Sequence, residues 1–212
     1  MQPFIFPHHY NFIKWQVQNL LNAYTGSTDL NVIRARKDIA QEAVFQLFAD
    51  LSDEQRQLLA PIRSLKEKNE AKQFLLSLSP YVVPFPAVTE QAIKKMYPKI
   101  KKLKPPVAAE LPYAELSYIS WFDNGSDKKF IIANYPDKLI GIHGTFTPMA
   151  KKGICAICNK VSDIGMFVLE ARGSSDGTYL KKGNYLCQDS TTCNQNIRSL
   201  DKLHEFLALM IK

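Results

Sequence analysis

The four cysteines of this chain fall into two close pairs. The first pair, Cys155 and Cys158, lies in the motif Cys-Ala-Ile-Cys, and the second is Cys187 and Cys193, with residues 159 to 186 between them. Thiolates are the preferred ligands of tetrahedral structural zinc, and two cysteines three positions apart can hold one edge of the tetrahedron across a tight turn. Because four cysteines leave no position for water, the pattern predicts one structural Zn²⁺ ion rather than a catalytic one.

Three other interpretations of the cysteines stay open at this point. Disulfides belong to oxidising compartments, but the N-terminal residues have neither the basic region nor the long apolar region of a secretion signal, so we expect a reduced, cytoplasmic protein. Four unrelated buried thiols would seldom fall into two close pairs. A thioredoxin-like redox role for Cys155 and Cys158 would leave the second pair unexplained. The spacing therefore favours zinc.

Length and composition indicate an ordinary folded protein. The chain has 212 residues, of which 46% are hydrophobic and 22% charged, close to the averages of globular proteins. This length allows one domain with a large core or two of moderate size. No apolar run approaches the roughly 20 residues that a membrane-spanning helix needs, so we expect no membrane contact.

Positive charge is concentrated in one segment of the chain. The formal net charge is +7, and residues 91–104 contain six lysines and no acidic residue. Such a surplus favours phosphates or an acidic protein surface, although a solvated helix face explains it equally well. The six lysines are Lys94, Lys95, Lys99, Lys101, Lys102 and Lys104.

Helical spacing of the apolar residues predicts an N-terminal helical bundle over residues 1–80. Thr28 or Asp29 should cap a second helix, which extends to Leu51 and is the longest of the chain. A capping box that begins at Ser52 predicts the start of a third helix. The apolar residues that the second helix should turn toward the core are Leu30, Ile33, Ile39, Ala43, Val44, Leu47 and Phe48.

Residues 81–110 are predicted to be a linker that contains a short lysine-rich helix. Its first part is rich in proline, which removes backbone donors and favours extended structure. The helix should begin near Thr89 and be stopped by Pro105 and Pro106.

Residues 111–212 are predicted to form a C-terminal α+β zinc-binding domain. Turn residues separate the expected strands, including Gly173 to Gly177 before the last one. After Cys187 the chain should become helical again with Ser190 as N-cap. The short alternating runs that predict an antiparallel sheet are residues 118–122, 129–135, 139–145, 166–171 and 178–186.

The order of elements around the cysteines is that of a treble-clef finger. A Cys-x-x-Cys turn is followed by a β-hairpin, and the second cysteine pair then enters a helix. One ion would tie the turn before the hairpin to the start of that helix. The sequence thus predicts an α+β chain, with an N-terminal helical bundle followed by an α/β domain that carries a treble-clef-like four-cysteine zinc finger.

Several motifs together resemble one known family, the FusB-type fusidic acid resistance proteins, over essentially the whole chain. The motifs are the run from Lys94-Lys95 to Lys101-Lys102-Leu103-Lys104-Pro105, the strand Trp121-Phe122-Asp123, the segment Leu139-Ile-Gly-Ile-His-Gly-Thr-Phe, and the cysteines Cys155, Cys158, Cys187 and Cys193.

The resemblance implies a cytosolic bacterial protein that is not an enzyme. Members bind elongation factor G, chiefly through the zinc domain contacting the factor's C-terminal domains, and promote its release from ribosomes stalled by fusidic acid. The drug is neither modified nor pumped, so resistance arises by target protection. We expect a monomer with no small-molecule substrate. By the same resemblance the four cysteines are the zinc ligands, and Lys181, Lys182 and Tyr185 lie in the region that contacts the factor.

The strand before Cys187 has a composition suited to such a contact. It carries Tyr179, Lys181, Lys182 and Tyr185, and aromatic and basic residues on a rigid support suit recognition of an acidic partner. Alternatively, the two tyrosines pack in the core and the lysines are merely solvated.

Two further classes of function remain as alternatives. A zinc-finger RNA- or ribosome-binding module would also be basic, but residues 111–212 hold only two arginines, Arg172 and Arg198, and twelve basic against ten acidic residues. An enzyme would need a recognisable base or nucleophile motif. The histidines lie in none, and we expect the adjacent pair near the first helix to be exposed; they are His8, His9, His143 and His204.

Overall fold

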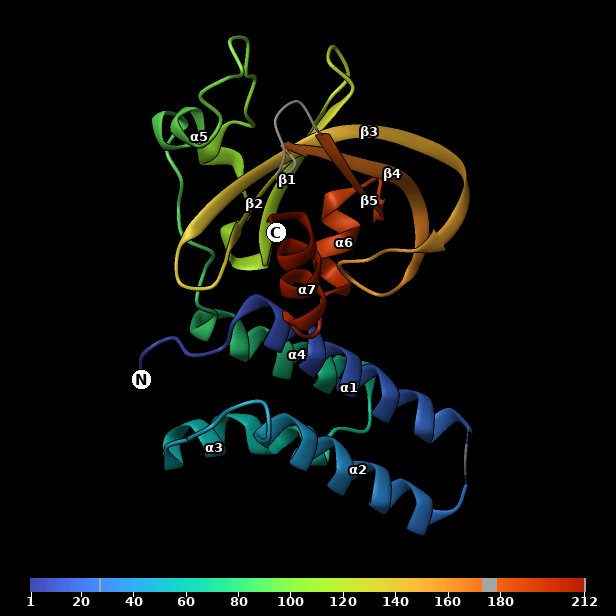
Figure 1. The fold of residues 1–212 in the computed structure, drawn as a ribbon. Coiled ribbons are helices and arrows are strands. Elements are labelled where there is room, and N and C mark those ends of the chain that lie inside the picture. The colour runs from blue at the N-terminus through green and yellow to red at the C-terminus, as the bar shows by residue number, and fades with distance from the viewer. Residues whose placement is uncertain (27, 173–178, 212) are drawn as a thin grey trace. The chain divides into compact units, whose positions relative to one another are not determined.

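The computed structural model describes residues 1–26, 28–172 and 179–211, without the side chains of residues 171, 172 and 179. The chain divides into two compact units, Met1–Val83 and Pro84–Lys212 (Figure 1). Each unit has its own hydrophobic core. None of the helices in the described residues combines the length and the hydrophobicity that crossing a lipid bilayer requires.

The first unit is helical, as predicted. Its core is built from buried residues of the helices, among them Ile13, Val17, Val44 and Phe74. The elements are α1 (Pro7–Gly26), α2 (Leu30–Phe45), α3 (Asp53–Leu59), α4 (Lys68–Leu78) and two short 3₁₀ turns, η1 (Ala60–Ser64) and η2 (Ser79–Tyr81).

The prediction for the second helix was wrong in length and in part of its buried face. Helix α2 ends at Phe45 and has 16 residues, so α1, with 20, is longer. Leu30 and Ile39 are 78% and 60% exposed, whereas Ala40 and Val44, one turn apart, are buried. The apolar residues after Phe45 reach the core from a turn, and a hydrophobicity pattern does not distinguish that turn from more helix.

Polar side chains fix two of the helix starts, as the sequence indicated. The Asp29 carboxylate accepts a hydrogen bond of 2.8 Å from the Asn31 amide at the start of α2. At the start of α3, the Ser52 hydroxyl accepts from the Gln55 amide at 3.2 Å, and the Gln55 side chain accepts from the Ser52 amide at 2.9 Å. This reciprocal capping box satisfies amides that the helix itself cannot pair.

The second unit is built on an antiparallel sheet with the strand order β1-β2-β3-β4-β5, a simple meander. In Figure 1 the long strands β3 and β4 curve around α6 and α7. The strands are β1 (Tyr118–Asp123), β2 (Lys128–Asn134), β3 (Leu139–Ile154), β4 (Val161–Arg172) and β5 (Tyr179–Cys187). The helices are α5 (Glu90–Met96), α6 (Ser190–Asn196) and α7 (Asp201–Ile211), with short 3₁₀ turns η3 (Ala108–Glu110) and η4 (Tyr113–Glu115).

Strands β3 and β4 are longer than the sequence predicted. β3 continues past residue 145 to Ile154, and β4 begins at Val161 rather than at residue 166. The pairing of the two strands shifts register between Pro148 and Lys152, and such an irregularity breaks the alternation by which a strand is recognised. The turn expected at residues 173–177 lies outside the described residues.

Alternate residues of the central strands contribute to two different cores. Ile131 and Ala133 of β2 belong to a cluster that includes residues of α6 and α7. Phe130 and Ile132 belong to a second cluster with Ile93 of α5. Since successive side chains of a strand point to opposite faces, β2 is covered on both sides.

Helix α5 ends at Met96, well before the prolines predicted to stop it. Pro98 disfavours helical backbone at the preceding residue, and Tyr97 accordingly has φ −125° and ψ 58°. The Tyr97 ring is buried, and its hydroxyl donates to the Ile131 carbonyl at 2.9 Å. The lysines from Lys99 onward therefore lie in a non-helical segment.

His9 is half-buried in the first unit, contrary to the expected exposure. Its ring contacts the Phe48 ring edge-on at 5.0 Å, and its Nδ1 atom is buried without a hydrogen-bond partner among the described residues. Burial lowers the pKa of His9 to about 4. The folded unit thus favours neutral imidazole.

We expect acid to destabilise the first unit through His9. The unfolded chain, with a histidine pKa near 6.5, binds the proton more tightly than the folded chain does. His9 therefore contributes about 1–2 kcal/mol to the free energy of unfolding, after allowance for its partial exposure. This contribution is complete above about pH 6.5 and is lost as the pH falls toward 4. Urea unfolding of a Trp121→Phe chain, followed by Trp15 fluorescence, measures it. A His9→Gln variant should lose this part of the pH dependence, and an unchanged dependence would contradict the assignment.

Candidate metal centre

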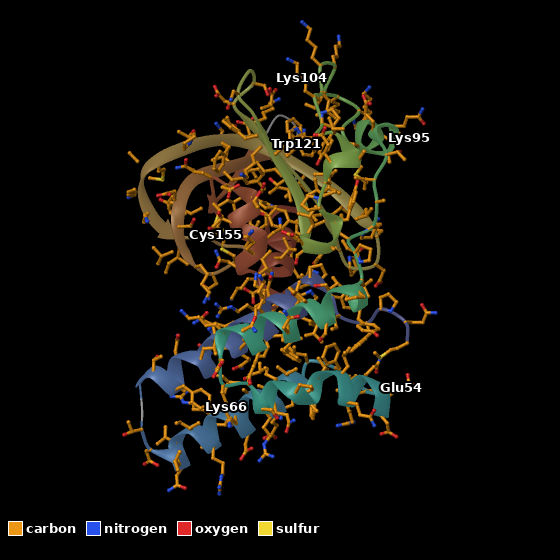
Figure 2. All side chains as sticks on the ribbon, turned by 180° about the vertical axis from the view of Figure 1, so that it is seen from behind. Glu54, Lys66, Lys95, Lys104, Trp121 and Cys155 are labelled. Atoms are coloured by element: carbon orange, nitrogen blue, oxygen red, sulfur yellow. The ribbon has the colours of Figure 1, made fainter. Side chains whose placement is uncertain are left out.

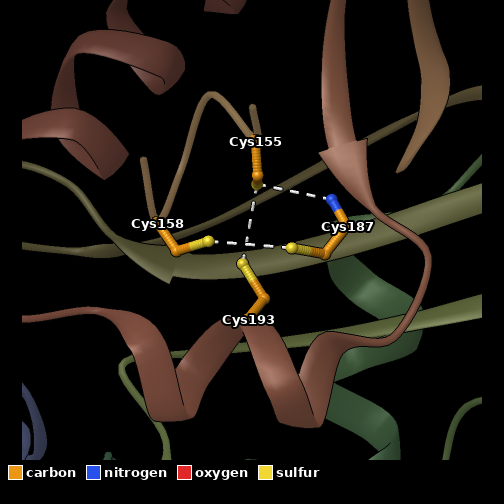
Figure 3. Close-up of side chains that lie close together, drawn as sticks. All are labelled: Cys155, Cys158, Cys187 and Cys193. Carbon is orange, nitrogen blue, oxygen red and sulfur yellow. Dashed lines mark hydrogen bonds between the residues drawn. The ribbon is translucent and has the colours of Figure 1, made fainter. Parts of the chain in front are cut away.

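The four cysteine sulfurs, which the sequence pairs two by two, converge on one point in the second unit (Figure 3). All lie within 4.8 Å of one another. The Sγ atoms of Cys155 and Cys193 are 3.8 Å apart, and those of Cys158 and Cys187 are 3.7 Å apart. A tetrahedron with Zn–S bonds of about 2.3 Å has edges of about 3.8 Å, so the spacing fits zinc. All four cysteines are free thiols, which excludes the disulfide interpretation.

The first cysteine pair sits in the turn that joins β3 to β4. The Cys155 amide donates to the Lys160 carbonyl at 3.1 Å, and the Asn159 amide donates to the Cys155 carbonyl at 2.9 Å. Asn159 adopts the left-handed region with φ 53°, which asparagine tolerates better than most residues. The Ile157 amide also points at the Cys155 sulfur, at 3.4 Å. Backbone geometry thus shapes this turn around the first sulfur.

The second pair comes from the end of β5 and the first turn of α6. The Cys187 amide donates to the Cys155 sulfur at 3.3 Å, which links the two pairs directly. Cys193 is buried within α6, and its amide donates to the Asp189 carbonyl at 3.2 Å. A helix N-terminus favours a negatively charged thiolate at this position.

The sequence indicated Ser190 as the N-cap of α6, but the N-cap in the structure is Asp189. The Asp189 carboxylate accepts from the amides of Thr191 and Thr192 at 3.1 and 2.9 Å. A carboxylate can accept from two amides at once, which a hydroxyl does less well. Ser190 instead donates its hydroxyl to the Ser120 carbonyl at 3.0 Å and so connects α6 to β1.

Asn194, next to Cys193, fixes the position of α6 against the sheet. It is 2% exposed. Its side-chain oxygen accepts from the amides of Ser117 and Tyr118 at 2.7 and 3.2 Å. Its side-chain nitrogen donates to the Tyr118 carbonyl at 3.0 Å. Because the start of β1 and the helix that carries Cys193 share this side chain, the sheet holds the fourth sulfur in place.

Lys129 is a buried cation beside the cysteines, 2% exposed. Its Nζ atom donates to the carbonyls of Cys187 and Gln188 at 3.1 and 2.9 Å and lies 4.6 Å from the centre of the Phe146 ring. Burial lowers the pKa of this ammonium, and negative charge on the cysteine sulfurs, foremost Cys193, opposes that shift. Four thiolates around one Zn²⁺ carry a net charge of −2, which a nearby ammonium offsets.

The thiols alone cannot all ionise at this spacing. Hydrogen bonds with the other thiols, Cys158 first, lower the pKa of Cys155, while hydrogen bonds to Cys155 raise the pKa of Cys158 and of Cys193. The group therefore stabilises one thiolate at the expense of its neighbours. A divalent cation removes this conflict, so the donor set and its surroundings fit a metal.

Sequence reasoning identified the sulfurs but missed Lys129 and Asn194. A signal for Lys129 existed, because it shares the period-two pattern of Ile131 and Ala133 in β2 and hence their buried face. Asn194 gave no such signal. Its role depends on the start of β1, more than seventy residues earlier in the chain.

The four residues predicted to contact a partner all lie on β5, on alternating faces. Lys181 forms an ion pair with Glu170 at 3.1 Å, and Tyr185 is 38% exposed. These two share one face of the strand, while Lys182, paired in register with Leu169, belongs to the other. Tyr179 begins β5, but its side chain lies outside the described residues.

His143 and His204, the histidines of the second unit, pack among aromatic side chains. His143 packs against the rings of Tyr97 and Phe130 at 5.8 and 5.6 Å, and burial lowers its pKa. His204 packs against Tyr135 at 5.6 Å. Among the described residues, the four cysteines form the cluster in which three or more side chains could bind one metal ion.

The turn at Cys155, the β4–β5 hairpin and α6 define a treble-clef zinc-finger domain. A family described as the FBP C-terminal treble-clef zinc-finger matches residues 96–207, and one described as elongation factor G-binding protein, N-terminal, matches residues 4–86. The solved structure of the fusidic acid resistance protein FusC is 32% identical, covers 97% of each chain and has a TM-score of 0.84. No curated protein matches the sequence. The chain belongs to the FusB-type family of fusidic acid resistance proteins, and its cofactor is one structural zinc.

Removing the metal should unfold the second unit and spare the first. Metal affinity at such a site is also folding free energy, because the ligands converge only in the folded state. We expect about one zinc per purified chain. Chelation or Cys158→Ser should abolish the near-ultraviolet circular dichroism of the second unit and leave most helical signal. Fewer than about half a zinc per chain, with native cysteines open to alkylation, would refute the assignment.

Replacing Lys129 tests the role of the buried ammonium. Lys129→Met keeps the length of the side chain but removes both the charge and the two hydrogen bonds to the Cys187 and Gln188 carbonyls. We expect zinc to be released to a chromophoric chelator at least about tenfold faster, the size of effect typical for groups that support metal ligands. The control is Lys128→Met, at the neighbouring, partly buried lysine that begins β2. Equal release rates for the two variants would show that Lys129 serves only packing.

Proposed function

We propose that this protein binds elongation factor G and thereby gives resistance to fusidic acid. The observation that carries the proposal is the similarity to the fusidic acid resistance protein FusC, which extends over 97% of both chains at 32% identity. The match of residues 4–86 to the elongation factor G-binding family supports the same partner. We also propose that the ligands of the structural zinc are Cys155, Cys158, Cys187 and Cys193.

A surface beside the zinc centre is suited to the contact, and we refer to it as the knuckle face: Ile154, Val161, Lys181 and Tyr185. Ile154 and Val161 pair across the base of the Cys155 turn and are 61% and 68% exposed. The Ala156 amide in that turn donates to the Tyr185 carbonyl at 2.8 Å, which fixes β5 beside it. Exposed apolar residues and a tyrosine on a rigid support are typical of a protein-binding surface.

The chemistry of the knuckle face favours an acidic protein partner. Lys181 is exposed apart from its ion pair with Glu170, and such a pair at the surface holds its lysine only weakly. Lys182 and Tyr179, on the same strand, complete the proposed contact residues. We propose that the zinc-bearing unit contacts the C-terminal domains of the factor, and that the protein acts as a monomer in the cytoplasm.

Resistance would then come from binding and not from chemistry on the drug. We propose that the protein promotes release of elongation factor G from ribosomes on which fusidic acid has stalled it. Such an action needs differential affinity for the free factor, not a nucleophile or an activated water. The filled coordination of four sulfurs is in keeping with this, because it offers no open position to a substrate.

Substitutions on the knuckle face should weaken binding of elongation factor G. We expect Tyr185→Ala to lower the affinity about thirtyfold, or about 2 kcal/mol, as for central aromatic residues of interfaces. Val161→Ser should have a smaller effect. Leu209→Ser, at an apolar residue of α7 that is 51% exposed, is the matched control. Isothermal titration calorimetry with the zinc-loaded chain measures all three, and wild-type affinity for Tyr185→Ala would exclude this surface.

The mode of resistance is tested on stalled ribosomes. Added protein should raise the amount of free elongation factor G after sedimentation of ribosomes stalled by fusidic acid, and the drug should be recovered chemically unchanged. The Tyr185→Ala variant should release less factor in proportion to its lower affinity. A modified drug would identify an enzyme, and binding without release would limit the function to sequestration of the free factor.

A further inference from the structure

The segment that follows α5 forms an ordered loop with lysines on its outer side. We call it the lysine loop: residues 97–106. Ile100 and Leu103 are partly buried against the second core of the unit, whereas Lys99, Lys101, Lys102 and Lys104 are exposed. The Ile100 amide donates to the Tyr97 carbonyl at 3.0 Å. The two apolar anchors and the flanking prolines fix the loop, so its four lysines project together.

Carboxylates do not neutralise these lysines. Lys94, on α5, forms an ion pair with Glu90 at 2.6 Å. Among the described residues, Lys95 and the four loop lysines have no ion pair within 4.0 Å. Lys104 contributes to the lowered pKa of Asp123, after the hydrogen bonds from Ser126 and Gly125. Figure 2 shows Lys95 and Lys104 extending outward from this part of the second unit.

The rest of the chain is nearly balanced in charge. Residues 1–83 contain nine basic and eight acidic residues, and residues 105–212 contain twelve and eleven. Five of the seven net positive charges therefore reside in the lysine loop and α5. A positive potential concentrated in this way attracts polyanions over distances of about a Debye length, roughly 8 Å at physiological salt.

The composition of the lysine loop favours phosphate over protein as its partner. Interfaces between proteins are depleted in lysine and depend on aromatic or apolar anchors. In residues 91–106, the large apolar side chains are buried or partly buried, and the exposed residues are the six lysines, Gln91 and Pro98. Lysine contacts with the phosphate backbone need no such anchors and are independent of base sequence.

We propose that Lys95, Lys99, Lys101, Lys102 and Lys104 form a binding surface for the phosphate backbone of RNA. The knuckle face and this surface belong to the same unit but to different elements, β3–β5 for the knuckle face and α5 with the segment after it for the lysines. One unit can thus bind a protein and an RNA through separate residues. The choice of RNA rests on the proposed function, since elongation factor G works on the ribosome; the affinity for phosphate does not.

The experiment measures binding of the zinc-loaded, full-length chain to a fluorescein-labelled RNA hairpin by anisotropy at several salt concentrations. Each phosphate contact in a duplex contributes about −0.9 to the slope of log affinity against log salt. We expect Lys101→Gln/Lys102→Gln/Lys104→Gln to lower affinity at least about tenfold at low salt and to reduce the slope by about 2. Circular dichroism and zinc content confirm that this triple variant is folded.

A second triple variant controls for net charge. Lys14→Gln/Lys68→Gln/Lys72→Gln removes the same charge from exposed positions of the first unit and should leave the slope unchanged. Equal losses in both triple variants would reduce the effect to net charge and overturn the proposal. So would wild-type RNA affinity in the lysine-loop variant combined with weaker binding to elongation factor G, because the lysines would then contact the protein. Calorimetric titration with elongation factor G then distinguishes a failure of the lysine-loop proposal from a failure of the proposed function.

Discussion

The convergence of four cysteine sulfurs is the interaction on which the second unit depends. The sulfurs come from three elements, the β3–β4 turn, the end of β5 and the start of α6, and the Ala156 amide of the turn donates to the Tyr185 carbonyl of β5. Thiols at distances of 3.7 to 3.8 Å compete for ionisation, because nearby thiolates repel one another. A divalent cation attracts all four thiolates and so holds the three elements together. Lys129 of β2, which donates to the Cys187 carbonyl, and Asn194 of α6, which bonds to the start of β1, tie the arrangement to the sheet.

The two faces of the sheet make different contacts, because successive side chains of a strand point to opposite sides. In β2, neighbouring residues supply separate cores, so the strand is fixed from both sides. In β5 the same alternation separates Lys181 and Tyr185 from Lys182. A partner that lies flat on this strand can therefore use one of these sets at a time. Contact with both sets would require binding at the strand edge, which β5 provides as the last strand of the meander.

The metal centre was predictable from sequence because its chemistry is local. Cysteine spacing predicts ligand pairs, and the expected class, α+β with a treble-clef finger, is confirmed. The errors arose where tertiary packing overrides pattern. The apolar residues after Phe45 pack from a turn, and the shift between Pro148 and Lys152 hides the continuation of β3. Lys129 was missed because a charged residue in a strand is normally assigned to the solvent side.

Burial of Lys129 explains why a zinc finger can be part of a large core here. A centre with a net charge of −2 is costly beside apolar side chains, since charge is poorly solvated there. The Lys129 ammonium lies 4.6 Å from the centre of the Phe146 ring and donates to two carbonyls, one of them that of Cys187. The opposite charges of the ammonium and the metal centre thus lower the free-energy cost of burying both. Phe146 and the four cysteines can then belong to one continuous buried cluster.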